Sequence, residues 1–280
     1  MQMDQKLVSV NITTYNRALL LRRCLDSVLE QRYGLMEVVV VDDCSQDETS
    51  VVMEEYLKRD TRIKYIRHKT NKGNAQARNT ALQQCNGYYV AFMDDDDEWI
   101  DPDKLVKQVQ IFEESTDPRL GIICSSVKRI DKQGREKVKI EHRPLHLTSH
   151  ILVRNGIIHN STVMTKRHIM LEIGGFDIDL PYGIDAEFFR TMIVEYKYDI
   201  HFMPDVTTAY HEHDGMRMTT NSNADIKKTL KANIFIIRKH LKVFLIHPWA
   251  LIYRIYLGIK KILMIKISNA HLREKIAAKS

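Results

Sequence analysis

The first 125 or so residues alternate between short apolar segments and segments with apolar residues at helical spacing. Strands are expected at 7–13, 37–41, 62–66, 88–93 and 121–127, and helices at 17–31, 47–58 and 74–84. Strands that are apolar along their whole length are typical of a parallel sheet with helices on both faces. Ligands of such sheets bind outside the carboxyl ends of the strands. The sequence therefore predicts an α/β fold whose site lies at one edge of a mainly parallel sheet.

The chain is less regular after residue 127. We expect a hairpin at 128–140 that turns near Gly134, a strand at 161–165, a turn at Gly174-Gly175, a helix at 185–196, and short strands at 199–203 and 206–210. No GxGxxG or GxxxxGK(S/T) motif follows an expected strand. Neither a dinucleotide-binding site nor a P-loop is therefore indicated.

Carboxylates follow two of the expected strands, Asp42-Asp43 after the second and Asp94 to Asp97 after the fourth. Adjacent like charges repel, whereas a divalent cation is stabilised by carboxylate oxygens. An EF-hand loop does not fit, because its glycine and final glutamate positions hold Ile100 and Val106. The alternatives are a solvated turn and a helix N-cap. We expect Asp101 to cap a helix, Asp97 and Glu98 to be solvated, and Asp94 to Asp96 to carry chemistry.

Charge is distributed unevenly along the 280 residues, whose net charge is +6. The segment 225–280 has 13 Lys or Arg and 2 Asp or Glu, a net of +11, which leaves −5 for the first 224 residues. A basic tail on an acidic body predicts an anionic partner. The four cysteines form no CxxC pair, and no signal peptide is visible at the N-terminus. Both observations fit a reducing cytoplasm.

Five motifs together resemble the family 2 glycosyltransferases of GT-A fold, over about residues 7–215. They are VSVNITTYNR at 8–17, VVDDCSQD at 40–47, NKGNAQARN at 71–79, FMDDDDEW at 92–99, and GGFD at 174–177 followed by Asp185. The resemblance implies a mixed, mainly parallel sheet flanked by helices. It also implies transfer of a sugar from a nucleotide sugar.

The resemblance further assigns residues to the donor. The nucleotide-sugar-binding residues it implies are Thr14, Tyr15, Asn16, Asp43, Arg78, Asp94 and Asp95. Asp43 would accept a hydrogen bond from uracil, Arg78 would lie near the nucleotide, and Asp94 or Asp95 would reach the ribose. A UDP-sugar is the expected donor.

The resemblance also implies a metal and a catalytic base. Asp96 would bind Mn²⁺ or Mg²⁺, with a late histidine, His211 in preference to His213, as a second ligand. Asp185 would remove the proton of the acceptor hydroxyl, so that direct attack inverts the anomeric centre. A helix N-cap remains the alternative for Asp185. The segment 159–161 is expected to line the acceptor side, or else to form a turn.

The basic tail has the pattern of an amphipathic helix. At 100° per residue, Arg254, Lys260 and Lys261 fall opposite an apolar side made by Ile252, Tyr256, Ile259 and Leu263. This pattern favours a helix in a membrane interface, with a packed C-terminal helix or a homodimer contact as the alternatives. Its longest uncharged run has 11 residues, too few to span a bilayer. We expect a GT-A domain at 1–220 and a basic amphipathic helical region at 221–280.

The sequence thus predicts an inverting, metal-dependent glycosyltransferase of bacterial surface polysaccharide or O-antigen synthesis. Its expected acceptor is a lipid-diphosphate-linked saccharide. Its expected place is the cytoplasmic side of the cell membrane, bound peripherally to the anionic surface. Nucleic acid is not an expected partner, because the tail aromatics lie in an aliphatic stripe. The rivals are a nucleotidyltransferase and a catalytically inactive protein that binds sugar nucleotides.

Overall fold

The computed structural model describes residues 6–140, 142, 144, 146–154, 156–212 and 223–277, except for the side chains of 223–225, 261, 265 and 268–277. The chain forms two compact units. We call them the sheet unit (Met1–Arg143, Ile158–Phe176 and Lys197–His213) and the helical unit (Pro144–Ile157, Asp177–Tyr196 and Asp214–Ser280). The predicted boundary at 220/221 stays a prediction.

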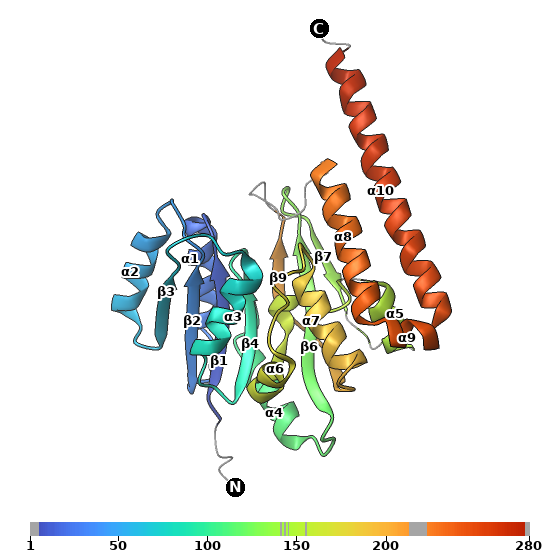
Figure 1. Ribbon diagram of the computed structural model, residues 1–280. Helices are drawn as coiled ribbons and strands as arrows, with labels where there is room; N and C mark the ends of the chain where they lie inside the picture. The colour runs from blue at the N-terminus through green and yellow to red at the C-terminus, as the bar shows by residue number, and fades with distance from the viewer. Residues whose placement is uncertain are drawn as a thin grey trace. The chain divides into compact units, whose positions relative to one another are not determined.

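The first half of the sheet unit is a doubly covered parallel sheet. Its strands are β1 (Val8–Thr14), β2 (Met36–Asp42), β3 (Ile63–Arg67) and β4 (Tyr89–Asp94), in the order β3-β2-β1-β4. Every residue of β1 and β2 is buried, as expected for central strands with helices on both faces. The helices are α1 (Ala18–Leu29), α2 (Thr49–Arg59) and α3 (Asn74–Gln84). Right-handed crossovers place α3 on the face opposite α1 and α2, and Figure 1 shows α3 in front of the strands.

The register brings the predicted acidic strand ends to one edge. Thr14 lies beside Asp42 on β2, and Thr13 lies beside Asp94 on β4. The prediction of a shared carboxyl edge is therefore confirmed. Each of the first four strands lies within one residue of its expected range, because an apolar run bounded by polar residues defines a buried strand.

The second half of the sheet is mixed and curls. Its remaining strands are β5 (Asp97–Trp99), β6 (Leu120–Ile130), β7 (Glu136–Lys139), β8 (Met164–Lys166) and β9 (Asp199–His211), in the order β4-β8-β6-β9-β5 with β7 on β6. Five strands in a flat sheet would separate β4 from β5 by about 19 Å. The three residue steps from Asp94 to Asp97 reach at most about 11 Å, so the sheet must curve back on itself there.

Several local predictions need correction. The segment 161–165 begins with a 3₁₀ turn, η1 (Asn160–Thr162), before β8, and the two strands expected at 199–210 are one continuous strand, β9. β5 was not expected at all. Helix α4 (Lys104–Glu114) has Asp103, not Asp101, at its N-cap position. The Asp101 carboxylate instead accepts hydrogen bonds from Asp103 N at 2.9 Å and from Lys107 Nζ at 2.7 Å.

The predicted turn at Gly174-Gly175 is confirmed and ends helix α6 (Arg167–Ile173). Both glycines have positive φ, 87° and 79°, where other residues are strained. A Cβ on Gly175 would also lie 2.5 Å from Asn79 Oδ1. The Asn79 amide accepts a hydrogen bond from Phe176 N and donates one to Phe176 O, so the turn is fastened to α3.

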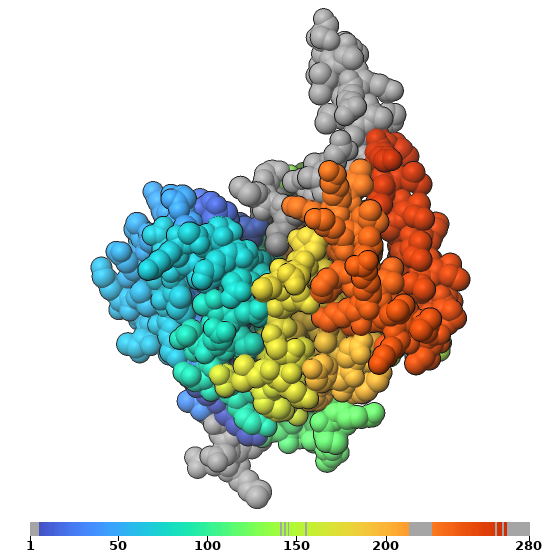
Figure 2. Space-filling model, in the orientation of Figure 1, coloured from blue at the N-terminus to red at the C-terminus, as the bar shows by residue number. Residues whose placement is uncertain are grey.

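The helical unit consists of α5 (Leu147–Val153), α7 (Ile184–Val194), α8 (Asn223–Lys239), α9 (Leu241–Ile246) and α10 (Pro248–Ala277). Helices α8 and α10 lie side by side, orange and red in Figure 2. Within the described residues, no helix is long and apolar enough to cross a membrane.

The charged side of α10 differs from the prediction. Arg254 is buried and donates hydrogen bonds to the carbonyls of Leu152, at 2.6 Å, and Val153. A helix in a membrane interface would leave its charged side in water, and the burial of Arg254 departs from that pattern. The apolar side is what α10 exposes: its four expected residues, Ile252, Tyr256, Ile259 and Leu263, are each more than half exposed.

Candidate active site

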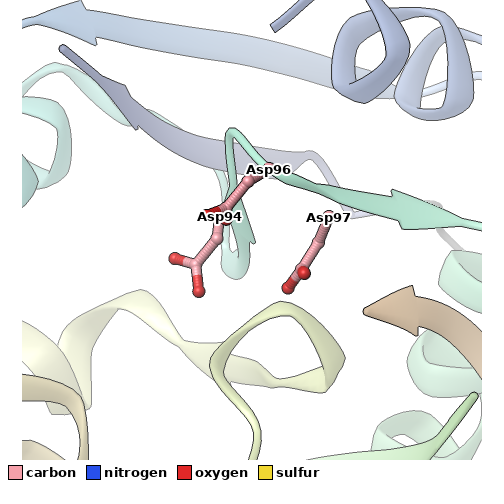
Figure 3. Close-up of side chains that lie close together, drawn as sticks. All are labelled: Asp94, Asp96 and Asp97. Carbon is pink, nitrogen blue, oxygen red and sulfur yellow. The ribbon is translucent and has the colours of Figure 1, made fainter. Parts of the chain in front are cut away.

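Four carboxylates gather where β4 turns into β5. We call Asp94–Asp97 the acidic turn, because β4 ends at Asp94 and β5 begins at Asp97. Asp94, Asp96 and Asp97 each place one carboxylate oxygen within 4.8 Å of the others. Figure 3 shows the three side chains leaving the turn, with those of Asp94 and Asp97 directed to the same side. An acidic cluster is therefore present as predicted, but its converging members are Asp94, Asp96 and Asp97, with Asp97 in place of Asp95.

Neighbouring elements fix two of these carboxylates. The buried Arg78 of α3 forms an ion pair with Asp94. Asn160 Nδ2 donates to Asp94 Oδ1 at 2.9 Å. Ser161 Oγ donates to Asp97 and accepts from the backbone N–H of Asp94 at 3.1 Å. The η1 turn and α3 therefore both hold the acidic turn, and they meet at Asp94 Oδ1.

Charge is not balanced across the acidic turn. Burial opposes ionisation of Asp94, yet Arg78 keeps the pKa of that carboxyl below its usual value. Burial raises the pKa of Asp95 to about 6, although Arg17 opposes the shift. Burial, followed by repulsion from Asp94 and Asp96, raises the pKa of Asp97 well above its usual value. Asp95 and Asp97 therefore resist ionisation unless a positive charge binds beside them.

The donor set fits a hard divalent cation. Asp97 is buried, and its Oδ1 has no hydrogen-bond partner among the described residues. A buried carboxylate oxygen without a partner is costly, and a cation would remove that cost. Three convergent carboxylates suit Mg²⁺ or Mn²⁺, which prefer oxygen ligands.

Arg17 faces the acidic turn from the start of α1. Its Nη1 donates to Asp95 Oδ1 at 2.7 Å and to Asp96 Oδ2 at 2.9 Å. Arg23, six residues further along the chain in α1, donates to the carbonyl of Asp96 at 2.7 Å. Arginine thus supplies positive charge at Asp96, the carboxylate to which the resemblance assigns the metal.

Asp43 lies at the same sheet edge, just after β2. Its Oδ1 accepts hydrogen bonds from Lys72 N and His68 Nδ1, both at 2.8 Å, and its Oδ2 accepts one from Gly73 N at 2.7 Å. A carboxylate offers about four lone-pair positions, so Oδ2 retains one for a ligand. Asp42, in contrast, is fully buried and accepts from Ser45 N and Tyr65 Oη, which makes it a structural residue.

The loop after β1 is joined to the Asp43 loop. Asn16 has a positive φ of 53° and donates from its backbone N–H to Ser45 Oγ at 2.9 Å, while its Oδ1 accepts from Gln46 N at 2.7 Å. Thr14 is buried at the end of β1, and its carbonyl accepts from Asp43 N. Tyr15 is partly exposed. The structure thus brings Thr14, Tyr15 and Asn16 together with Asp43, as one rigid pair of loops.

Two predicted residues lie outside this group. Asp185 is in the first turn of α7, in the helical unit, and Gly183 occupies the N-cap position there. His211 ends β9, and its Nε2 lies 2.8 Å from Glu98 Oε2. It is not among the side chains gathered at the acidic turn. His213 lies outside the described residues.

Sequence reasoning missed three contributors: Asp97, Arg17 and His68. The expectation that Asp97 is solvated is wrong, because β9 pairs with β5 and buries it. Arg17 was visible only as part of the first motif. His68 follows β3 and contacts Asp43 and Thr80. Because β3 ends at the same edge of the sheet, the position of His68 directly after this strand could have indicated its role.

Known proteins resemble the chain in sequence. The model of the family described as Glycosyl transferase family 2 matches residues 9–172. TuaG of Bacillus subtilis (strain 168), named as a teichuronic acid biosynthesis glycosyltransferase, is 37% identical over 161 residues, 58% of this chain and 62% of TuaG. The Escherichia coli UDP-Glc:alpha-D-GlcNAc-diphosphoundecaprenol beta-1,3-glucosyltransferase WfgD is 40% identical over 109 residues, 39% of this chain and 42% of WfgD. The chain thus spans less than two thirds of the length of each relative.

Solved structures resemble it in fold. S. aureus TarS 1-349 in complex with UDP-GlcNAc superimposes with a TM-score of 0.64 at 21% identity, over 83% of this chain and 67% of TarS 1-349. The mannosyltransferase PcManGT from Pyrobaculum calidifontis, in complex with GDP-Man and Mn²⁺, gives 0.62 at 23% identity, over 99% of this chain and 81% of PcManGT. With the family match, these likenesses establish that the chain belongs to glycosyl transferase family 2 and has the GT-A fold.

Proposed function

We propose that this protein transfers a sugar from a UDP-sugar to a hydroxyl group of a lipid-diphosphate-linked saccharide, with inversion and with the help of Mn²⁺ or Mg²⁺. The observation that carries the proposal is the convergence of Asp94, Asp96 and Asp97, within 4.8 Å, at the edge where the Asp43 loop also lies. A nucleoside diphosphate needs both a base site and a neutraliser of phosphate charge. The Asp43 loop would supply the base site, and the three carboxylates with a bound cation would neutralise the phosphates at the same edge.

The donor's base belongs at the Asp43 loop. The remaining lone pair of Asp43 Oδ2 accepts the N–H of uracil, and a charged acceptor gives strong selectivity for that edge. The partly exposed ring of Tyr15 offers a face for the base. As the resemblance implies, Asp94 or Asp95 would contact the ribose, and Arg78 would also contact the nucleotide.

The donor's diphosphate belongs at the acidic turn, where Asp96 would hold the cation together with its neighbours. A bound divalent cation supplies Lewis-acid stabilisation of the departing diphosphate. Arg17 donates to Asp96 Oδ2, and a carboxylate offers about four lone-pair positions, so a cation can bind Asp96 while Arg17 stays in place beside the phosphates. His211 remains a proposed ligand that would first have to leave Glu98.

Asp185 is the proposed base. The positive end of the α7 dipole favours its ionised form, and the acceptor hydroxyl must lose its proton during attack. Asp185→Asn retains the shape and removes the basic charge, so turnover should fall by about 10² to 10⁴ while UDP affinity stays unchanged. Normal turnover in this variant would assign the reaction's base elsewhere.

Hydrolysis and transfer assays with a panel of nucleotide sugars, with and without Mn²⁺, test the reaction itself. The proposal expects release of UDP from one sugar nucleotide, dependent on the cation. Release of pyrophosphate from a nucleoside triphosphate would instead indicate a nucleotidyltransferase. Binding of UDP-sugars without any turnover would indicate an inactive sugar-nucleotide-binding protein.

The proposed acceptor and cellular location are inferred from the basic tail, residues 225–280. The α9–α10 segment exposes large apolar side chains: Leu245, Ile246, Trp249, Ile252, Tyr256, Ile259, Leu263, Met264 and Ile267. Apolar residues exposed together with a net charge of +11 suit the interface of an anionic membrane. WfgD, by its name, acts on a diphosphoundecaprenol-linked sugar. We therefore place the enzyme on the inner face of the cell membrane, in synthesis of a bacterial surface polysaccharide such as O-antigen.

Vesicle flotation tests the membrane part. The double change Trp249→Ser and Ile252→Ser should abolish flotation with anionic vesicles, and high salt should weaken flotation of the unaltered protein. Leu19→Ser and Val51→Ser, on exposed positions of the sheet unit, are the matched control. A change from dimer to monomer without loss of flotation would make this surface a homodimer contact.

A further inference from the structure

Three cations share one face of the β6–β7 hairpin. In this antiparallel pair Arg129 lies directly opposite Lys137, and Val127 lies directly opposite Lys139. Opposed residues, and residues two apart on one strand, point to the same face. Arg129, Lys137 and Lys139, which we call the cationic face, therefore project together.

The other side of the hairpin neutralises its own charge. Lys128 Nζ lies 3.0 Å from Glu136 Oε2, and the turn contains the ion pair of Arg135 with Asp131 at 2.6 Å. Within the described residues, Arg129 and Lys137 form no ion pair. Like charges directly opposite each other destabilise a hairpin. Their retention on an exposed face points to an anionic ligand.

A series of contacts leads from this face to the acidic turn. The Arg129 guanidinium lies 5.7 Å from the centre of the Tyr210 ring, its neighbour on β9. The Tyr210 and His159 rings meet edge to face at 5.3 Å. His159 Nδ1 lies 3.9 Å from Asp97 Oδ2. β6, β7 and β9 lie side by side in Figure 1, and β9 also pairs with β5, so paired strands join the cationic face to the acidic turn.

The electrostatics of His159 agree with this placement. Burial lowers the pKa of His159; Asp94 opposes the shift, and Arg129 and Lys139 increase it. One imidazole thus senses both the acidic turn and two members of the cationic face.

We propose that the cationic face binds the diphosphate of the acceptor. The acceptor saccharide would then lie over Tyr210 and His159, with its reacting hydroxyl directed to the acidic turn. This assignment rests on the proposed glycosyl transfer, since it names where that reaction's second substrate binds. The donor diphosphate is a poorer fit to this face, because Asp96 and its cation already serve it.

Binding of geranyl diphosphate, a lipid diphosphate without a saccharide, tests the assignment directly. The protein is first saturated with UDP and Mn²⁺ so that the donor site is occupied. The double change Arg129→Gln and Lys137→Gln should weaken geranyl diphosphate binding at least tenfold. The double change Lys128→Gln and Arg135→Gln removes the same charge from the paired positions of the hairpin and should alter binding less than twofold. Lys137→Gln alone, at an exposed position, serves if the first variant fails to fold.

The outcomes are separable. Equal binding by the two double variants overturns the proposal. A parallel loss of UDP affinity in the first variant also overturns it, because the cations would then serve the donor. Loss of flotation with anionic vesicles, with geranyl diphosphate binding retained, would assign the face to lipid headgroups instead. Failure of the unaltered protein to bind UDP speaks against the proposed function, and the geranyl diphosphate comparison can still be read without it.

Discussion

Each unit contains a buried carboxylate, and the groups around the two carboxylates carry opposite charge. Asp97 in the sheet unit and Glu187 in the helical unit are both 1% exposed. Glu187 forms an ion pair with Arg190, lies 2.8 Å from His240 Nε2 and lies 3.3 Å from Lys239 Nζ. Burial acts against its ionisation, yet these partners lower the pKa of Glu187 to about 2. Asp97 has Asp94 and Asp96 as neighbours, and its pKa is raised.

The difference separates a carboxylate that the fold neutralises from one that we propose is held for a ligand. Around Glu187, cations from α7 and α8 neutralise the charge, so the folded chain completes its own network. At the acidic turn, four carboxylates face chiefly Arg17 and Arg78, and one buried oxygen has no partner among the described residues. Burial alone therefore does not mark function. The proposed site rests instead on convergent carboxylates with a buried oxygen that has no partner among the described residues.

The largest expected effect comes from Asp96→Ala. Transfer should fall by at least about 10³-fold, because Lewis-acid assistance is worth several kcal/mol. Calorimetry of UDP binding with and without Mn²⁺ should show that the enhancement by the cation is lost. Retention of metal-enhanced UDP affinity in this variant would move the cation site away from the acidic turn. Thermal stability should change little or rise, since repulsion is relieved.

Glu187→Ala should have the opposite profile. Removing one partner of a buried ion pair costs about 3–5 kcal/mol, and the buried Arg190 would lose its ion pair with Glu187 while His240 would keep only Glu195. Denaturant unfolding measures the loss, and UDP affinity at a temperature where the variant is folded is the control. Glu187→Gln keeps the volume and should recover part of the stability. A variant that kept full stability would show that the network adds nothing to the fold.

The same carboxylate predicts an acid limit. The pKa of Glu187 falls from 4.5 to about 2 on folding, so the unfolded chain binds the proton more readily in this range. The contribution to stability is complete above pH 4.5 and is lost as pH falls through about 2. Glu187→Gln should therefore flatten the acid limb of the stability profile relative to the unaltered protein.

Asp43→Ala should have a smaller effect, confined to the nucleotide. Loss of a hydrogen bond to a charged group costs about 1.5–3 kcal/mol of UDP affinity. Because Asp43 also accepts from Lys72 N and Gly73 N, Asp43→Asn is the companion variant that retains most of the loop. An unchanged dissociation constant in both variants would place uracil elsewhere.

Sequence patterns predicted the features of the fold that depend on residues close together along the chain. β1 to β4 and α1 to α3 followed from apolar periodicity, and the shared acidic edge followed from parallel topology. The curl of the sheet, the burial of Asp97 and the Arg17–Asp96 contact depend on pairings such as β5 with β9, far apart in sequence. The burial of Arg254 was missed for the same reason, since helical periodicity does not reveal that α5 accepts its hydrogen bonds.

Lys104 shows that a disfavoured buried charge does not by itself indicate a site. Its charge is disfavoured by burial, yet it belongs to no site. It is fully buried, donates to Gln108 Oε1 at 2.7 Å and lies 4.2 Å from the centre of the Trp99 ring. Burial lowers the pKa of Lys104 to about 7. The unfolded chain therefore binds more protons than the folded chain between pH 7 and the ordinary lysine value of about 10.4, and stability from this group must rise with pH in that window.

Lys104→Met should remove that rise. The difference in unfolding free energy between the variant and the unaltered protein should change by at most about 1.4 kcal/mol per pH unit between pH 7 and 10. Taking the difference cancels the other lysines and tyrosines that titrate in the same range. Parallel stability profiles would mean that Lys104 keeps its charge when folded. In either case UDP affinity should not change. The acidic turn is distinguished by carboxylates that converge at the ligand-binding edge of the sheet, whereas Lys104 is a buried charge that does not lie among them.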